Sequence, residues 1–323
     1  MSGQLKGSRL KLLILIKRFD KHFPKHRMKY EMIKALEQFA DVYYWHQDGD
    51  IKEIINQIGV TPDFILHYDT AWNYTFAPHV EKLDEISIPK GCFVIDVHWK
   101  KQKRVQYFNE NQIDLIFSVS KYPFLKAFPS FEKRWRWVPF SIDPTVFKDW
   151  QQSKEYAYLL MGLVHYDGLR YPAKGRYAFR EQVLSQLGNE DGFVFFKHPG
   201  HLTKKTQLLN EQFAQHLNRA EIFFTCGSVM QYPVSKFFEA PACRTLLLAE
   251  SNPDIEELGF IDGEHFVACN QTNVYQNALY YHENPKERQE ITDKGYAFVQ
   301  QWHTNQVRAQ QWIKEMEVFL HGS

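Results

Sequence analysis

The feature that most constrains the fold is a regular alternation of short apolar runs with segments of helical spacing. Leu10–Ile16 is a continuous apolar run between basic residues, which is typical of a buried parallel strand. Met28–Ala40 then places apolar residues at helical spacing, and Val42–Trp45 returns to a strand pattern. Further strand-like runs follow at 63–67, 91–97 and 115–119, with helical segments between them. Strands that alternate with helices predict a parallel sheet with helices on both of its faces.

A second alternating series begins after a break in the pattern at Val138–Pro144. Its strand-like runs lie at 156–161, 193–197, 222–225 and 245–249. A chain of 323 residues exceeds the usual size of one hydrophobic core. We therefore expect two α/β domains, at residues 1–143 and 144–300. A C-terminal helix at 301–323 is expected to pack back on the first domain.

The distribution of charge limits the classes of partner. The formal net charge is +1, which argues against a protein whose main task is binding nucleic acid over a wide surface. Basic residues nevertheless gather near the beginning of the chain and at 100–104. Such runs are usually solvated faces. The alternative is attraction to an anionic acceptor or to a membrane surface, where the protein would be peripheral.

The cysteines and the early apolar run bear on location. The four cysteines lie far apart with no Cys-x-x-Cys pair, which disfavours both a disulfide framework and a structural zinc site. The run Leu12–Ile16 is too short for the core of a signal peptide and for a membrane span. We therefore expect a soluble, cytoplasmic protein.

Lys236 and Glu239 form the most informative polar pair. They stand three residues apart in a segment of helical character, so their side chains share one face of a short helix. A helix start beside a lysine suits a diphosphate, and a carboxylate one turn later can accept both hydroxyl groups of a ribose. An exposed ion pair has the same spacing and is the alternative.

A run of about thirty residues around this pair follows a family pattern. It comprises Lys236–Cys243, Thr245–Glu250, Asp254–Phe260 and Asp262–Val267, which read as a K-[FY]-x-E-A-x-A helix, a buried strand and an acidic segment. This run resembles the C-terminal domain of GT-B glycosyltransferases, particularly the spore-maturation CgeB-type members. The resemblance implies two Rossmann-like domains whose parallel sheets face each other across a cleft. The first domain would lie on the acceptor side, and the second would bind a nucleotide-sugar with Glu239 on its ribose.

The resemblance extends more faintly over most of the chain. Val138–Asp143 is similar to the link that enters the second GT-B domain. Gly162 stands where the family brings its backbone close to phosphate. A Tyr-Pro pair followed by Arg176 and Arg180 resembles the family's YP-x-R element. This makes Arg176 a predicted diphosphate ligand, with an exposed helix arginine as the alternative.

Two residues depart from the family pattern. Retaining members of the wider superfamily carry a glutamate that contacts the donor sugar eight positions before the second one, and Gln231 stands there in this chain. An amide can hydrogen-bond a sugar hydroxyl but carries no charge, so Gln231 bears on the donor sugar or on the activity itself. Arg244 replaces the usual glycine, and it either binds the diphosphate or lies on the surface.

Polar residues also follow strands at the predicted cleft. A buried strand of the first domain ends in Asp96-Val97-His98. GT-B enzymes often place a histidine here. His98 is therefore predicted to hydrogen-bond the transferred sugar or to act as a base, with a structural histidine as the alternative. Asp96 would orient His98 or the acceptor, or else cap a loop. In the second domain, His198 would line the nucleotide pocket, unless its segment is an ordinary Pro-Gly turn.

These residues predict transfer of a sugar from a nucleoside-diphosphate-sugar donor to an unidentified acceptor. That acceptor would be a glycan, a cell-envelope or spore-surface component, or a protein. GT-B enzymes commonly stabilise the leaving diphosphate with basic side chains, so we expect no required metal and no cofactor besides the donor. Asp48-Gly49-Asp50 has the letters of a metal motif but lies in an apparent surface loop. A nucleotide-sugar epimerase of the same fold and a non-catalytic carbohydrate-binding or scaffold protein are the alternatives.

Overall fold

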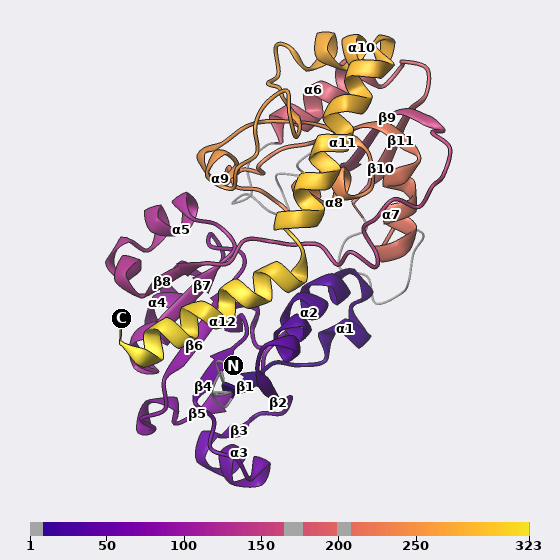
Figure 1. Cartoon of the computed structure of the whole chain (residues 1–323). Helices are drawn as coiled ribbons and strands as arrows, with labels where there is room; N and C mark the ends of the chain where they lie inside the picture. The colour runs from indigo at the N-terminus through magenta and orange to yellow at the C-terminus, as the bar shows by residue number, and fades with distance from the viewer. Residues whose placement is uncertain (1–8, 165–176, 199–207, 323) are drawn as a thin grey trace.

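The computed structural model describes residues 9–164, 177–198 and 208–322, and it contains a large parallel sheet in each half of the chain (Figure 1). The first sheet has the strand order β2-β1-β4-β6-β7-β8, and every neighbouring pair is parallel. Its strands are β1 (Lys11–Leu15), β2 (Asp41–Trp45), β4 (Phe64–His67), β6 (Lys90–Val94), β7 (Leu115–Ser118) and β8 (Trp135–Trp137). A small separate pair joins β3 (Gly49–Asp50) to β5 (Val80–Glu81).

The second sheet has the strand order β10-β9-β11-β12-β13, again with every pair parallel. Its strands are β9 (Tyr156–Gly162), β10 (Phe193–Lys197), β11 (Ala220–Thr225), β12 (Leu246–Ala249) and β13 (Val267–Ala268). The two parallel sheets confirm the α/β class that the alternating pattern predicts.

Helices connect the strands and cover the sheets. In the first half they are α1 (Phe19–His22), α2 (Arg27–Lys34), α3 (Ile51–Ile58), α4 (Lys101–Glu110) and α5 (Tyr122–Ala127). Short 3-10 helices are η1 (Pro24–His26), η2 (Ala35–Gln38), η3 (Thr70–Trp72), η4 (Leu83–Glu85) and η5 (Pro129–Arg134). The later helices are α6 (Ala178–Leu187), α7 (Asn210–Asn218), α8 (Lys236–Ala242), α9 (Pro253–Glu257), α10 (Val274–Glu283), α11 (Pro285–Trp302) and α12 (Asn305–His321). Within the described ranges, none is long and apolar enough to cross a membrane.

The apolar run of β1 is buried because helices cover both faces of its sheet. Leu12 and Ile14 point into one apolar cluster, which includes residues of α2 and α12. Leu13 and Leu15 point into another cluster, which includes residues of α3. Successive side chains of a strand face opposite sides of the sheet, so a strand covered on both sides has a continuous apolar run instead of alternating apolar and polar residues.

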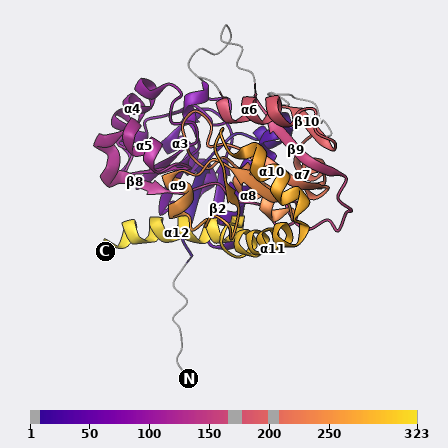
Figure 2. The same ribbon diagram turned by 90° about the horizontal axis from the view of Figure 1, so that it is seen from above.

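The C-terminal stretch lies along one side of both halves (Figure 2). Its helical pattern breaks at Thr304, whose side chain accepts a hydrogen bond from the backbone N–H of Val307 at 3.3 Å and caps α12. Helix α12 then packs on the first half, where Trp312 is fully buried between Phe93 and Phe117. The ring centroids of Trp312 and Phe93 lie 4.8 Å apart.

The two chain segments that pass between the halves are hydrogen-bonded to each other. The backbone N–H of Ile142 donates to the carbonyl of His303 at 2.9 Å, and the N–H of Asn305 donates to the carbonyl of Ile142 at 2.8 Å. The hydroxyl of Ser141 adds a 2.7 Å contact with the side-chain oxygen of Asn305. Residues at or just after the carboxyl ends of β4, β6, β9 and β11 line a common cavity.

Candidate active site

A cavity of about 320 Å3 lies between the two halves. From the first half it is lined by Phe19, Lys25, His26, Met28, Lys29, Met32, Tyr68, Trp72, Phe76, Ile95, Asp96, Phe140 and Ser141. From the second it is lined by Phe147, Met161, Leu163, Tyr177, Arg180, His198, Leu208, Leu209, Asn210, Phe213, Ser228, Tyr232, Val234, Ser235, Lys236 and Glu239. Many of these residues follow the carboxyl ends of strands, where ligands bind in folds of this class.

Lys236 and Glu239 line this cavity from the first turn of α8. Burial lowers the pKa of Lys236, and the charge of Glu239 partly opposes that effect. Burial likewise raises the pKa of Glu239, with Lys236 opposing. Among the ion pairs of the described residues, none joins the Lys236 ammonium to a carboxylate oxygen within 4.0 Å. Lys236 and Glu239 therefore do not form the exposed ion pair that was the alternative interpretation of their spacing.

Arg180 lines the cavity from the second half, whereas Gly162 itself does not line it and lies between the lining residues Met161 and Leu163. Gly162 ends β9 with a φ of 145°, and a Cβ atom there would lie 2.8 Å from Nη1 of Arg180. Arg180 is buried, with 6% of the residue exposed, and its Nη1 donates to the carbonyl of Leu163 at 3.2 Å. The glycine thus lets a buried arginine approach the end of the strand closely. No carboxylate of the described chain pairs with this arginine.

Asp96 reaches the cavity wall, but His98 does not line it. The turn after β6 is fixed by a buried ion pair, in which Arg104 donates to both carboxylate oxygens of Asp69 at 2.7 and 3.0 Å. Asp69 also accepts the backbone N–H of Ile95 at 3.0 Å, and Arg104 donates to the Asp96 carbonyl at 3.1 Å. These contacts aim Asp96 at the cavity, while His98 lies half-buried in the turn before α4.

The remaining predicted residues fall in different places. His198 lines the cavity, and Nζ of Lys25 donates to its Nε2 at 2.9 Å. Gln231 is exposed and does not line the cavity; its side-chain amide donates to the carbonyl of Ser228 at 3.1 Å. Its neighbour Tyr232 does line the wall. Arg176 lies outside the described residues.

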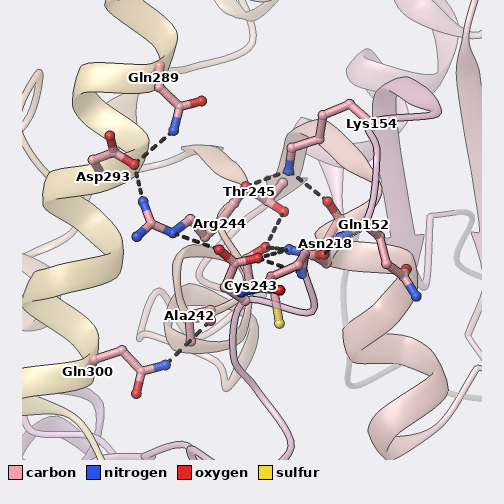
Figure 3. Close-up of polar contacts among 12 residues, drawn as sticks. Gln152, Lys154, Asn218, Ala242, Cys243, Arg244, Thr245, Gln289, Asp293 and Gln300 are labelled. Atoms are coloured by element: carbon pink, nitrogen blue, oxygen red, sulfur yellow. Dashed lines mark hydrogen bonds and ion pairs between the residues drawn. The ribbon is translucent and has the colours of Figure 1, made fainter.

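Arg244 does not line the cavity, and its side chain points toward Asp293 of α11 (Figure 3). Its guanidinium pairs with Asp293 and, at 3.3 Å, with Asp149, and it stacks over Tyr296 at 4.2 Å. Its φ of 55° is left-handed, which explains why a glycine suits this turn. The ion pairs, and not a diphosphate, account for the arginine.

Lys154, which lies in the segment between the first half and β9, is bonded to three backbone carbonyls of the second half. The ammonium of Lys154 donates to the backbone carbonyls of Asn218 and Ala220, each at 2.7 Å, and to that of Arg244 at 2.5 Å (Figure 3). The side chain of Asn218 donates to the carbonyl of Cys243 at 2.8 Å. These bonds hold the segment that follows the domain crossing against the base of α8, and so fix the position of that helix.

Three basic cavity residues are not predicted from the sequence as ligands of the donor. Lys25 and Lys29 belong to the early basic run, which has the composition of a solvated face. Arg180 belongs to the same sequence element as the predicted ligand Arg176, and its close approach to Gly162 becomes visible only in the structure. The available signal for Lys29 is that it lies in the segment that follows the carboxyl end of the first strand, where ligands of parallel sheets bind.

The described residues contain no cluster of three or more His, Cys, Asp or Glu side chains with the geometry to hold a metal ion. The four cysteines are all buried and unpaired. The described part of the cavity is lined by four lysine and arginine side chains, those of Lys25, Lys29, Arg180 and Lys236.

Comparison with known proteins agrees with this architecture. Residues 173–314 match the model of a family described as Glycosyl transferase-like. No curated protein matches the sequence. The structure of Anabaena HepE in complex with UDP-glucose is similar with a TM-score of 0.56 and 11% identity, covering 96% of this chain and 100% of that chain. A glycosyltransferase from Rickettsia africae has a TM-score of 0.58 and 11% identity, covering 98% and 100%. The chain therefore has the GT-B fold of glycosyltransferases, with two Rossmann-like regions that each contain a parallel sheet.

Proposed function

We propose that this protein is a glycosyltransferase that binds a nucleoside-diphosphate sugar in the cavity between its halves. The observation that carries the proposal is the pair Lys236 and Arg180, which bring two positive charges to one cavity without a carboxylate partner within 4.0 Å in the described chain. Unpaired cations in a partly buried site favour an anionic ligand. The match of residues 173–314 to a Glycosyl transferase-like family supports the choice of a sugar donor.

In the proposed complex, the diphosphate lies between Lys236 and Arg180, and Glu239 accepts the hydroxyl groups of the ribose. Burial raises the pKa of Glu239, which means that the charged carboxylate is destabilised in the cavity without a ligand. Hydrogen bonds donated by the ribose hydroxyl groups would stabilise the charged carboxylate. HepE has been solved with UDP and glucose and with UDP-glucose, so UDP-sugars are the first donors to test.

The chemistry would break the bond between the anomeric carbon and the diphosphate oxygen. The electron pair of that bond goes to the diphosphate, and the acceptor oxygen forms the new bond to the anomeric carbon while its proton passes to the Asp96 carboxylate. Lys236 and Arg180 would stabilise the charge that grows on the diphosphate. Asp96 enters the cavity from the other half and is the proposed contact for the acceptor. His98 does not line the cavity, so it has no proposed contact with the reacting atoms.

Two further parts of the proposal concern membership of the CgeB-type group and transfer without a metal ion. The resemblance around Lys236 and Glu239 favours the CgeB-type group and leaves the acceptor open. We also propose that lysine and arginine supply the positive charge at the diphosphate, so transfer should persist in excess EDTA. A reaction that stops with EDTA and returns with Mg²⁺ would contradict this part alone.

The test is nucleotide binding followed by product analysis. The unfolding temperature of the wild type should rise with at least one of UDP, GDP and ADP, because a ligand of the folded state stabilises it. Glu239→Ala and Lys236→Met should remove that rise. Glu264→Ala and Lys286→Met change exposed residues of the same half and should keep it. With a sugar donor and an acceptor extract, the enzyme should release free nucleoside diphosphate.

Three outcomes would count against the proposal. If no nucleoside diphosphate raises the unfolding temperature, the cavity is not a donor site. If Glu239→Ala binds as the wild type does, the ribose site is misplaced. If the enzyme converts the donor to its epimer with the nucleotide still attached, the protein is a nucleotide-sugar epimerase.

A further inference from the structure

Lys29 brings a positive charge to the cavity from the opposite half. It lies in α2, and its half-buried side chain lines the same cavity as Lys236 and Glu239. Its ammonium sits 5.7 Å from the centre of the Phe140 ring. No carboxylate of the described residues lies within 4.0 Å of it. Lys29 thus shares with Lys236 and Arg180 the lack of an anionic partner.

Lys29 is also near enough to act electrostatically on the predicted donor residues. Its positive charge contributes to lowering the pKa of Lys236, where burial is the largest cause. It also lowers the pKa of Glu239, against the larger effect of burial. Lys29, Lys236 and Glu239 all line one cavity of about 320 Å3, so a single ligand in that cavity can contact all three.

Neighbouring residues hold this segment against the second half. Arg27 pairs with Glu211, and the side-chain amide of Asn210 donates to the carbonyl of Pro24 at 3.2 Å. Lys25 donates to His198 at 2.9 Å. Residues 24–29 therefore face the second half directly. Lys25 and Arg27 are bonded to side chains of that half, whereas among the described residues Lys29 forms no hydrogen bond or ion pair with it.

We propose that Lys29 is a third ligand of the diphosphate, supplied from the half opposite Lys236 and Arg180. This inference rests on the proposed function. Three cations that meet in one cavity repel each other when it is empty, and a diphosphate between them converts that repulsion into attraction. Donor binding would therefore favour the arrangement in which the two halves meet.

The test compares UDP and uridine by calorimetry in the wild type, Lys29→Gln, Lys29→Arg and Lys34→Gln. Lys34 lies on the same helix but is exposed and outside the cavity, which makes it the matched control. Lys29→Gln should weaken UDP binding by about tenfold or more, because it removes a hydrogen bond to a charged group. Uridine binding should stay unchanged, Lys29→Arg should restore most of the UDP affinity, and Lys34→Gln should behave as the wild type.

The outcomes separate this inference from the function on which it rests. Equal UDP affinity in Lys29→Gln and the wild type would overturn the role of Lys29 and leave the donor site intact. An equal loss for UDP and uridine that arginine does not rescue would also overturn it, since the residue would then only support the cavity. A wild type that binds neither UDP nor another nucleoside diphosphate would overturn both proposals.

Discussion

At the scale of single residues, His67 shows how burial makes stability depend on pH. Its Nε2 donates to the carbonyl of Pro78 at 2.9 Å, so its Nδ1 is the acceptor of the Tyr107 hydroxyl at 2.7 Å. The neutral ring therefore satisfies both of its partners. Burial lowers the pKa of His67 to about 4.

This lowered pKa predicts a loss of stability in mild acid. Between about pH 6.5 and pH 4 the unfolded chain binds a proton at this histidine and the folded chain does not, so stability falls as the pH falls. At pH 5 the effect is about 2 kcal/mol for the single residue. Urea unfolding at pH 7 and pH 5 should show a smaller pH dependence for His67→Gln than for the wild type. The exposed His22→Gln should match the wild type, and an unchanged dependence in His67→Gln would contradict the assignment.

At the scale of an element, α12 completes the core of the first half although it comes last in the chain. Trp312 is fully buried against Phe93 and Phe117, and its indole N–H has no hydrogen-bond partner among the described residues. Its contribution is therefore packing and not hydrogen bonding.

Substitution of Trp312 tests this role. Trp312→Ala should lower the free energy of unfolding by about 3–5 kcal/mol, because it leaves a large cavity. Trp312→Phe should cost much less, since it keeps a ring and removes an unpaired donor. Urea unfolding monitored by circular dichroism would measure both. Trp302→Ala is the control, because Trp302 is 53% exposed at the end of α11. A loss in Trp302→Ala as large as that in Trp312→Ala would contradict the packing argument.

The elements were easier to predict from the sequence than the site. Continuous apolar runs such as the one in β1 mark strands that are buried on both faces, and that signal is local. The expected helix Met28–Ala40 tightens after Lys34 into the 3-10 turn η2, and helix pattern alone does not mark that change. Lys29 and Arg180 meet in one cavity although they are far apart in the chain, so no local pattern could join them. Asp96 and His98 share one turn, and the hydrogen bonds of Arg104 and Asp69 decide which of them reaches the cavity.

At the scale of the whole molecule, the two halves are also joined by a contact between α9 and the start of α5. The buried carboxylate of Asp254 accepts the backbone N–H groups of Lys121 and Tyr122 at 2.9 and 3.0 Å, at the start of α5. Lys121 also pairs with Glu257 at the surface. This contact must break if the halves swing apart about the hydrogen-bonded segments at Ile142 and Asn305.

Loss of the Asp254 contact should shift the protein toward an open form. Asp254→Ala leaves two backbone N–H groups without their acceptor, so the radius of gyration measured by small-angle scattering without nucleotide should increase. Glu257→Gln removes only an exposed ion pair and should leave the scattering nearly unchanged. Identical scattering from Asp254→Ala and the wild type would show that this contact does not hold the halves together.

The packing of α12 on the first half has a consequence for the order in which the protein is made. A ribosome synthesises residues 9–137 early, but the ring that fills the space between Phe93 and Phe117 belongs to residue 312. The second half also closes late, because α11 packs on α8 and β12 and contributes the buried Val299 to their cluster. Both halves are therefore completed by the last helices of the chain. Until residue 312 emerges, the space between Phe93 and Phe117 lacks the ring that fills it, and this apolar surface of the first sheet stays uncovered.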